Sequence, residues 1–307
     1  MEYVRLGLTD LKISRVGFGC AAMGGYDYGY TDDHDSIAAV HKALDLGVNF
    51  FDTADVYGFG HAEEVLSEAL GSCRHDVVVA TKFGVKWDEQ GRTTRDISPP
   101  RVMQALDASL RRLKLDSVPL YQIHWPDRDT PIGETIEALK KCQESGKIRA
   151  LGCCNFPVDL VEDAQAHCQL TTLQLPYSLA QRDFEETIRV CHQKYTISAL
   201  CYNPLAQGLL TGKYGPNATF EGTDLRRRSE LFSDDKFTAA LALLDKLKIV
   251  GERCGRTPAQ VAIQWILENP SVSCVITGIK KPLQIEENVG ALGGSLSAVD
   301  FDFLSAG

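Results

Sequence analysis

Eight short apolar runs, separated by longer amphipathic segments, recur from one end of this 307-residue chain to the other. Most of the runs are apolar throughout rather than alternating, which is typical of parallel strands buried on both faces. They cover residues 15–19, 48–52, 77–82, 119–124, 148–153, 171–175, 196–201 and 272–277. The count of eight predicts an α/β fold of the (β/α)8 TIM-barrel type, in one domain spanning residues 1–307 with long loops at its C-terminal mouth. A doubly wound open sheet is the alternative, because a single sequence does not reveal strand order.

Helix signals lie between these runs. Ser98 and Pro99 provide an N-cap and a first-turn proline for a helix. The apolar residues of that helix recur at Met103, Leu106, Leu110 and Leu113. Thr257 and Gln260 have the spacing of a capping box at the start of a second helix. The polar stretch 208–233 is longer than an ordinary connection, which favours a lid or binding loop.

Charge and cysteine content exclude several classes of protein. The net charge of -9 disfavours a nucleic-acid partner. No stretch reaches the roughly 20 apolar residues of a membrane span, and the N-terminus lacks a secretory signal. The ten cysteines are scattered without a C-x-x-C pair, which favours buried free thiols in a reducing cytoplasm over a zinc site. We therefore expect a cytoplasmic protein, monomeric or homo-oligomeric, without a metal, a membrane or a nucleic acid as partner.

Ionisable side chains end three consecutive predicted strands. Asp52, Lys82 and His124 close the second, third and fourth runs, and Tyr57 follows in the loop after the second. Because the carboxyl ends of barrel strands meet at one mouth, all four side chains can converge there. Taken singly, each also has a structural interpretation, such as a cap, a solvated strand end or a packed histidine. The joint placement favours a catalytic site.

The four residues have a shared chemical logic. A phenol with a pKa of about 10 is a poor acid at neutral pH, and a neighbouring ammonium makes it a better one. Asp52 would hold Lys82 charged, and His124 could orient a carbonyl oxygen or relay a proton. Such a site protonates an oxygen on which negative charge develops, as carbonyl reduction requires.

Neither a classical dinucleotide fold nor a serine hydrolase fits the sequence well. Residues 17–22 match the dinucleotide fingerprint G-x-G-x-x-A, but a loop-like segment follows where the fingerprint requires a helix. A serine hydrolase is disfavoured because no G-x-S-x-G is present. A metal-dependent barrel hydrolase or isomerase using Asp52 and His124 is a further alternative.

Around these residues the sequence resembles the aldo-keto reductase family, in particular its bacterial sugar- and inositol-operon subgroup. Segments 51–58, 80–82 and 122–127 resemble the family's segments that carry the catalytic aspartate with tyrosine, lysine and histidine. Segment 146–156 resembles the start of its nicotinamide pocket. The order of motifs is kept through 202–214 and 276–288, so the resemblance covers almost the whole chain.

The resemblance implies NADPH bound in an extended pose and a catalytic tetrad of Asp52, Tyr57, Lys82 and His124. It places Asn155 and Gln174 on the carboxamide and Tyr202 under the nicotinamide ring. The implied cofactor-binding set is Cys20, Asp52, Cys154, Asn155, Gln174, Tyr202, Asn203, Leu205, Gly208, Leu209, Gly212, Lys213, Gly278, Lys280, Gln284, Glu287 and Asn288. Within it, residues 205–213 would follow the pyrophosphate and residues 278–288 the adenosine.

The chain departs from the family pattern at three places. Cys154 replaces the usual serine before Asn155, and Cys20 lies near a frequent threonine. A thiol is a weak hydrogen-bond donor, so cofactor contacts there should be weaker. Lys280 and Lys281 occur where arginine usually binds the 2′-phosphate, and lysine binds phosphate as a point charge. We expect NADPH as the cofactor, with NADH as the alternative.

These observations predict reversible reduction of an aldehyde, ketone or sugar carbonyl. The hydride comes from the nicotinamide and the proton from Tyr57. The alternative is a cofactor-sensing regulatory subunit with little turnover. The substrate, a small carbonyl compound or sugar, is expected to contact Tyr26, Tyr57, Trp87, His124 and Trp125.

Overall fold

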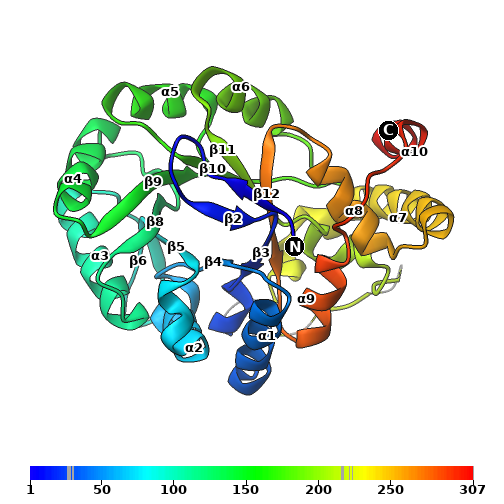
Figure 1. Ribbon diagram of the computed structural model, residues 1–307, viewed down its shortest axis with the longest axis horizontal. Coiled ribbons are helices and arrows are strands. Elements are labelled where there is room, and N and C mark those ends of the chain that lie inside the picture. Colours follow the sequence, from blue (N-terminus) through cyan, green and yellow to red (C-terminus); the bar gives the residue numbers. More distant parts are fainter. Residues whose placement is uncertain (26–28, 30, 216–217, 221, 223, 307) are drawn as a thin grey trace.

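The eight predicted strands form a closed parallel barrel in the computed structural model, which describes residues 1–25, 29, 31–215, 218–220, 222 and 224–306 (Figure 1). Each observed strand overlaps the run predicted for it, and closure excludes the open doubly wound sheet. Around the barrel the order is β10 (Thr172–Pro176), β11 (Ser198–Tyr202), β12 (Val272–Gly278), β3 (Val16–Gly19), β4 (Phe50–Asp52), β5 (Val78–Phe83), β8 (Val118–Ile123) and β9 (Ile148–Cys154).

Helices surround the barrel (Figure 1). They are α1 (Asp33–Asp45), α2 (His61–Leu70), α3 (Pro99–Leu113), α4 (Ile132–Glu144), α5 (Val158–His167), α6 (Glu185–Tyr195), α7 (Asp234–Cys254), α8 (Pro258–Leu267), α9 (Pro282–Val289) and α10 (Ala298–Ser305). The capping box predicted at the start of α8 is formed by Thr257 and Gln260. Proline begins α3 as predicted, but Met103 does not belong to its buried stripe and is 42% exposed. The stripe runs one position earlier, through Val102.

Alternation along the strands creates two apolar layers. One cluster fills the barrel interior and includes Phe50, Val78, Ala80, Leu120 and Leu200. Outward-facing residues of the same strands, such as Val79 and Tyr121, pack against the helices in the second cluster. Successive side chains of a strand point alternately into and out of the barrel, so Lys82 faces the same side of β5 as Ala80.

An antiparallel hairpin that the sequence pattern did not predict closes one end of the barrel. It pairs β1 (Tyr3–Arg5) with β2 (Lys12–Ser14). Leu6, Leu11 and Ile13 from this hairpin join the barrel-interior cluster. This end is therefore filled with apolar side chains, and the polar residues of the interior lie toward the other end.

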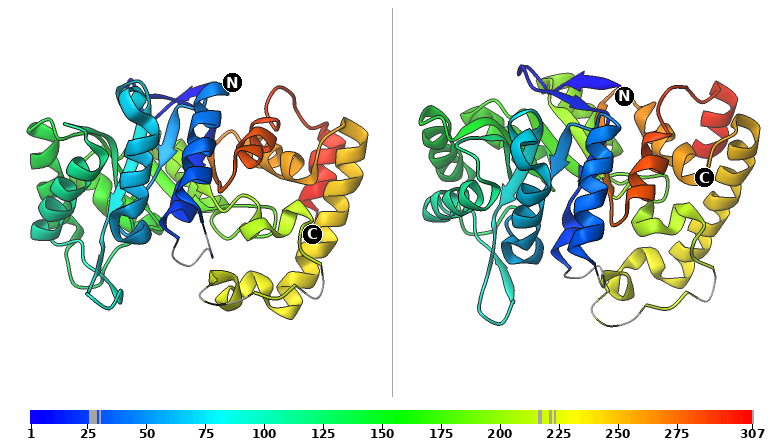
Figure 2. Two further views of the ribbon diagram at one scale, coloured as in Figure 1. Left: turned by 90° about the horizontal axis from the view of Figure 1, so that it is seen from below. Right: turned by 60° about the horizontal axis from the view of Figure 1, so that its bottom comes forward.

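Long connections project from the end opposite the hairpin (Figure 2). One carries the antiparallel pair β6 (Val85–Trp87) and β7 (Thr93–Arg95). The predicted long loop 208–233 contains only short 3-10 turns among its described residues: the end of η4 (Ala206–Thr211), η5 (Leu225–Arg228) and η6 (Glu230–Phe232). Both connections surround the C-terminal mouth, where the candidate site residues lie.

The dinucleotide fingerprint at residues 17–22 is not formed. Its first two glycines belong to β3, and a 3-10 turn, η1 (Ala21–Gly24), follows in place of an α-helix. A side chain at Gly17 would lie 2.7 Å from the Phe50 ring, so this glycine serves barrel packing. Among the described residues, no helix has the length and apolar character needed to cross a membrane.

Candidate active site

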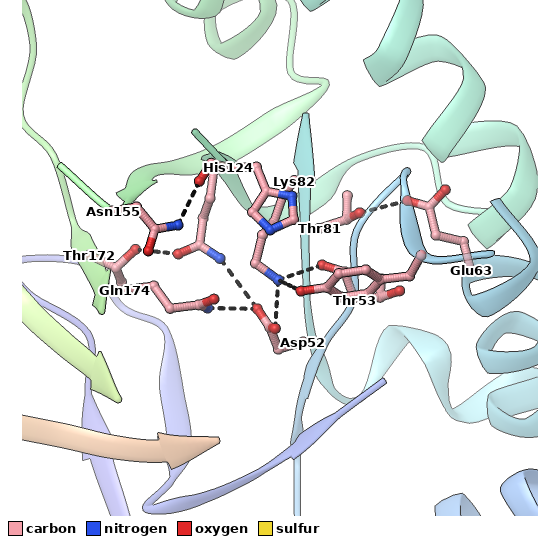
Figure 3. Close-up of polar contacts among 11 residues, drawn as sticks. Asp52, Thr53, Glu63, Thr81, Lys82, His124, Asn155, Thr172 and Gln174 are labelled. Carbon is pink, nitrogen blue, oxygen red and sulfur yellow. Dashed lines mark hydrogen bonds and ion pairs between the residues drawn. The ribbon is translucent and has the colours of Figure 1, made fainter. Parts of the chain in front are cut away.

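A buried ion pair joins Lys82 and Asp52 at the C-terminal ends of β5 and β4 (Figure 3). Lys82 is fully buried, and its Nζ lies 2.6 Å from Asp52 Oδ2. Nζ also donates to the carbonyl of Thr53 at 2.9 Å. Burial by itself lowers the pKa of Lys82, but the Asp52 carboxylate outweighs burial and raises the pKa above its ordinary value. The ammonium therefore stays charged throughout the neutral range.

Two amide side chains hold the other oxygen of Asp52. Gln174 Nε2 donates to Oδ1 at 2.8 Å, and Gln122 Nε2 lies 3.4 Å from the same atom. Gln122 Oε1 in turn accepts from the Thr172 hydroxyl at 3.1 Å. Gln122 was not predicted as a site residue, although an amide within the apolar run 119–124 was a signal. It faces inward because it follows Leu120 by two positions on β8.

Tyr57 begins η2 (Tyr57–Gly60), the next element after β4 along the chain. Its hydroxyl lies 3.4 Å from Lys82 Nζ, and its ring contacts His124 edge-on at a centroid distance of 5.6 Å. A close backbone approach fixes the loop, because a Cβ on Gly24 would overlap the nitrogen of Gly58. Gly58 also has a positive φ of 59°, which glycine adopts without strain. The loop geometry thus directs the phenol toward the ammonium.

His124 completes the predicted group of four. Its backbone N–H donates to Phe83 O at 2.7 Å, at the junction of β8 and β5. Burial, and then the positive charge of Lys82, hold the pKa of His124 well below its ordinary value. The imidazole is therefore neutral, with one donor and one acceptor nitrogen. Nδ1 is buried without a hydrogen-bond partner among the described residues.

Asn155, whose contact with His124 is drawn in Figure 3, links three strand ends beside this group. Its Nδ2 donates to His124 O at 2.9 Å, and its Oδ1 accepts from the Tyr202 hydroxyl at 2.9 Å. The two residues assigned to the carboxamide by resemblance thus have protein partners here: Asn155 bonds to His124 and Tyr202, and Gln174 bonds to Asp52.

Two thiols lie close to the buried ion pair. Cys20 and Cys154 are both buried, and the electrostatic influence of Asp52 and Lys82 reaches each of them. Burial is the main cause that raises the pKa of each thiol above its ordinary value. Both groups are therefore neutral thiols, which are weak hydrogen-bond donors.

Cations gather farther along the mouth. Burial lowers the pKa of both Lys213 and Lys280, and the charge of Arg226 lowers each further. Asp224 accepts a 2.8 Å hydrogen bond from Arg226 Nε. Lys280 is held by Gln284, whose Oε1 accepts its backbone N–H at 2.7 Å. The mutual repulsion of these cations makes the region suited to an anionic group.

The remaining residues that the resemblance assigns to cofactor binding lie near η4 or between the end of β12 and α9. Asn203, Leu205, Gly208, Leu209 and Gly212 lie in or beside η4, and Asn203 Oδ1 accepts the N–H of Gln207 at 3.1 Å. Gly278 ends β12, is exposed, and has no atom within 4 Å of where a Cβ would lie. Glu287 and Asn288 belong to α9, the first exposed and the second buried.

Aromatic residues line one side of the mouth. Trp125 stacks near His124 at a centroid distance of 6.4 Å. Trp87, at the end of β6, packs against Phe59 at 5.6 Å. Tyr26, also predicted to contact substrate, lies outside the described residues.

A buried contact between Asp55 and Arg101, in the segment that carries Tyr57, was not predicted from the sequence either. Asp55 Oδ2 lies 2.5 Å from Arg101 Nη2, and the Arg101 guanidinium lies over the Trp87 ring at 5.5 Å. Burial raises the pKa of Asp55 to about 7 against the opposing charge of Arg101. The only signal for Asp55 in the sequence was its position within segment 51–58.

A metal centre has no support in the described part of the chain. No group of three or more His, Cys, Asp or Glu side chains there is arranged to hold a metal ion. Both oxygens of Asp52 are occupied by protein donors. The metal-dependent barrel enzyme is thus the least supported of the alternatives.

Comparisons with known proteins agree with this geometry. The family model described as "Aldo/keto reductase family" matches residues 15–306. The aldo-keto reductase YhdN of Bacillus subtilis is 37% identical over 303 residues, which cover 98% of this chain and 91% of the relative. The NADH-specific methylglyoxal reductase of Escherichia coli is 31% identical, with coverage of 98% and 96%. Among solved structures, a glycerol dehydrogenase of Gluconobacter oxydans has a TM-score of 0.91 and 36% identity, with coverage of 98% and 93%.

Proposed function

Because this chain belongs to the aldo/keto reductase family, we propose that it reversibly reduces an aldehyde, ketone or sugar carbonyl with NADPH, and that Tyr57 donates the proton. One observation carries the assignment of roles. The Tyr57 hydroxyl lies 3.4 Å from the Lys82 ammonium, which Asp52 holds at 2.6 Å. The relatives are named as enzymes, so the cofactor-sensing subunit is not favoured.

The residues present fit a dinucleotide cofactor. Lys213, Lys280 and Arg226 form a cationic region that suits phosphate groups, and exposed Gly278 leaves room for close approach. The amide side chains of Asn155 and Gln174 lie at the other end, beside the ion pair. Bound NADPH would supply the hydride. NADH remains an alternative, because lysine at Lys280 does not provide the bidentate fork with which arginine binds a phosphate.

The protein's own groups manage charge and proton. Neutral His124 can donate a hydrogen bond to a carbonyl oxygen through a ring N–H. Tyr57 then gives its proton to that oxygen, and the phenolate left behind faces the Lys82 ammonium. Asp52 keeps Lys82 in position and is itself fixed by Gln174. Because these groups are already oriented, little reorganisation accompanies the transfer of charge.

We also propose a cytoplasmic location. All ten cysteines are free, and most of them are buried. Such a large number of free thiols is typical of proteins that are kept in a reducing compartment.

Tyr57→Phe tests the assignment. The variant should bind NADPH with unchanged affinity, measured by quenching of protein fluorescence, but lose at least about 100-fold in kcat, as expected for a missing general acid. Turnover is followed by NADPH consumption on methylglyoxal, glyceraldehyde and simple sugars, with NADH in parallel. Tyr3→Phe, in the hairpin at the opposite barrel end, is the matched control and should keep full activity. Near-normal turnover by Tyr57→Phe would show that another group supplies the proton.

A further inference from the structure

Two arginines lie over two tryptophans on the aromatic side of the mouth. The guanidinium of Arg95 lies 4.6 Å from the centre of the Trp125 ring, and that of Arg101 lies 5.5 Å from the Trp87 ring. Arg95 ends β7, so it belongs to the connection that projects at the mouth (Figure 2). The two pairs have similar ring contacts but differ in their electrostatic surroundings.

Arg101 has a carboxyl partner, whereas Arg95 has none among the described residues. Asp55 lies 2.5 Å from Arg101, which also donates to the carbonyl of Val85 at 3.0 Å. For Arg95, the described part of the chain provides no carboxylate within 4.0 Å. Arg92 lies in the hairpin formed by β6 and β7, as Arg95 does, and it pairs with Asp88 at 2.6 Å.

Two carboxylates next to Arg95 and Trp125 in sequence have other partners: Asp96 follows Arg95, and Asp127 lies two residues after Trp125. Asp96 accepts from the Ser98 hydroxyl at 2.6 Å and pairs with Lys86 at 3.0 Å. Asp127 accepts the backbone N–H of Ile97 at 2.8 Å and both the N–H and the hydroxyl of Thr130. Against burial, these hydrogen bonds hold the pKa of both carboxyls below its ordinary value. As far as the described residues go, the Arg95 charge is thus available to a ligand.

A chain of ring contacts connects Arg95, through Trp125 and His124, with Tyr57. Trp125 follows His124 in the chain, their rings lie 6.4 Å apart, and the His124 ring lies 5.6 Å from that of Tyr57. A carbonyl between His124 and Tyr57 therefore has Trp125 beside it and the guanidinium of Arg95 on the Trp125 ring. A guanidinium stacked on an indole keeps its N–H edges free for a bidentate contact.

We propose that Arg95, held on Trp125, binds an anionic group of the substrate. Resting on the proposed carbonyl reduction, this inference assigns the substrate class as short aldehydes or ketones that carry a carboxylate or phosphate ester a few carbons from the carbonyl. Arg95 is exposed, so the charge-assisted contact has modest strength, and we expect it to change kcat/KM by about tenfold.

Matched substrates with and without the anion provide the test. The carboxylate arm compares 4-oxobutanoate with butanal, and the phosphate arm compares glyceraldehyde 3-phosphate with glyceraldehyde. Wild-type enzyme should have the higher kcat/KM for the charged member of at least one arm. Arg95→Gln should lower that value about tenfold, mainly through KM, while kcat/KM for the neutral member stays within about twofold. Arg92→Gln, which removes a paired charge from the same hairpin, should change neither substrate.

The outcomes separate the two proposals. The arm in which Arg95→Gln abolishes the preference identifies the anion as carboxylate or phosphate. Equal losses on charged and neutral substrates, or no preference in the wild type, would overturn the role of Arg95 while leaving carbonyl reduction intact. Failure of the wild type to reduce any carbonyl in a Tyr57-dependent way would instead overturn the proposed function.

Discussion

Asp55 offers a test of the electrostatics behind the catalytic loop. It follows β4, is 1% exposed, and its backbone N–H donates to Lys82 O at 3.3 Å. Burial raises the pKa of this carboxyl to about 7, although Arg101 lies at 2.5 Å and lowers it. A carboxyl in an ion pair would ordinarily titrate well below the neutral range, so the structure predicts an unusual pH dependence of stability.

The sign follows from proton binding in the two states. The ordinary pKa is 3.8, so between pH 3.8 and about 7 the native protein holds a proton that the unfolded chain has lost. The free energy of unfolding therefore falls as pH rises through this range. The contribution is full below pH 3.8 and lost above about pH 7. With about 1.4 kcal/mol per pKa unit, the fall between about pH 5 and pH 8 amounts to about 2.5 kcal/mol.

Asp55→Asn removes this titration and nothing else that ionises. Urea unfolding of wild type and variant, at steps from about pH 5 to pH 8, gives the difference in unfolding free energy at each pH. Loss of the partner of Arg101 shifts the whole variant curve, so the slope of the difference is the quantity to measure. That difference should change by about 2.5 kcal/mol in favour of the variant as pH rises.

Asp107→Asn is the control for this experiment. Asp107 pairs with Lys147 at the surface, so its loss should leave the wild-type slope unchanged. A difference between wild type and Asp55→Asn that stays constant within about 0.5 kcal/mol would refute the reasoning. It would mean that Arg101 keeps the carboxyl ionised at every pH tested.

Two further predictions concern packing and thiols. Gly152→Ala should lower stability by about 1–3 kcal/mol in urea unfolding and reduce kcat, because the new Cβ would overlap the Thr172 hydroxyl beneath the ion pair. Unchanged stability would show that β9 moves aside at little cost. Alkylation of native protein by iodoacetamide should modify exposed Cys73 and Cys254 and spare buried Cys154, as mapped by peptide mass spectrometry. Labelling of Cys154 would contradict the buried, neutral state described for it.

The barrel could be predicted because most of its strands lie in buried runs that are apolar throughout. Most of the eight runs are apolar on both faces, since one face meets the barrel interior and the other meets a helix. The hairpin of β1 and β2 could not be predicted in this way. Its strands have three residues each and are partly exposed, so their pairing depends on the barrel end that they cover. The same applies to β6 and β7 at the mouth.

Site residues could be predicted from the sequence where they lie at the ends of predicted strands. Asp52, Lys82 and His124 came from the barrel geometry, which brings successive carboxyl ends together. Gln122 was missed because its inward direction depends on the register of β8 inside a closed barrel. The pairing of Arg95 with Trp125 joins two separate connections after different strands, and no local pattern encodes such a contact.

The hydrogen bonds of Lys82 explain why these residues act as one unit. An ammonium has three N–H donors, and three acceptors surround this one: Asp52 Oδ2, Thr53 O and Tyr57 Oη. The first two acceptors are fixed, because Gln174 holds Asp52 and the N–H of Thr53 donates to Ala80 O on β5. Only the third acceptor carries a proton that can leave. The positive charge that the barrel buries is therefore directed at the phenol oxygen, and in the proposed reaction it would favour the transition state in which Tyr57 gives up its proton.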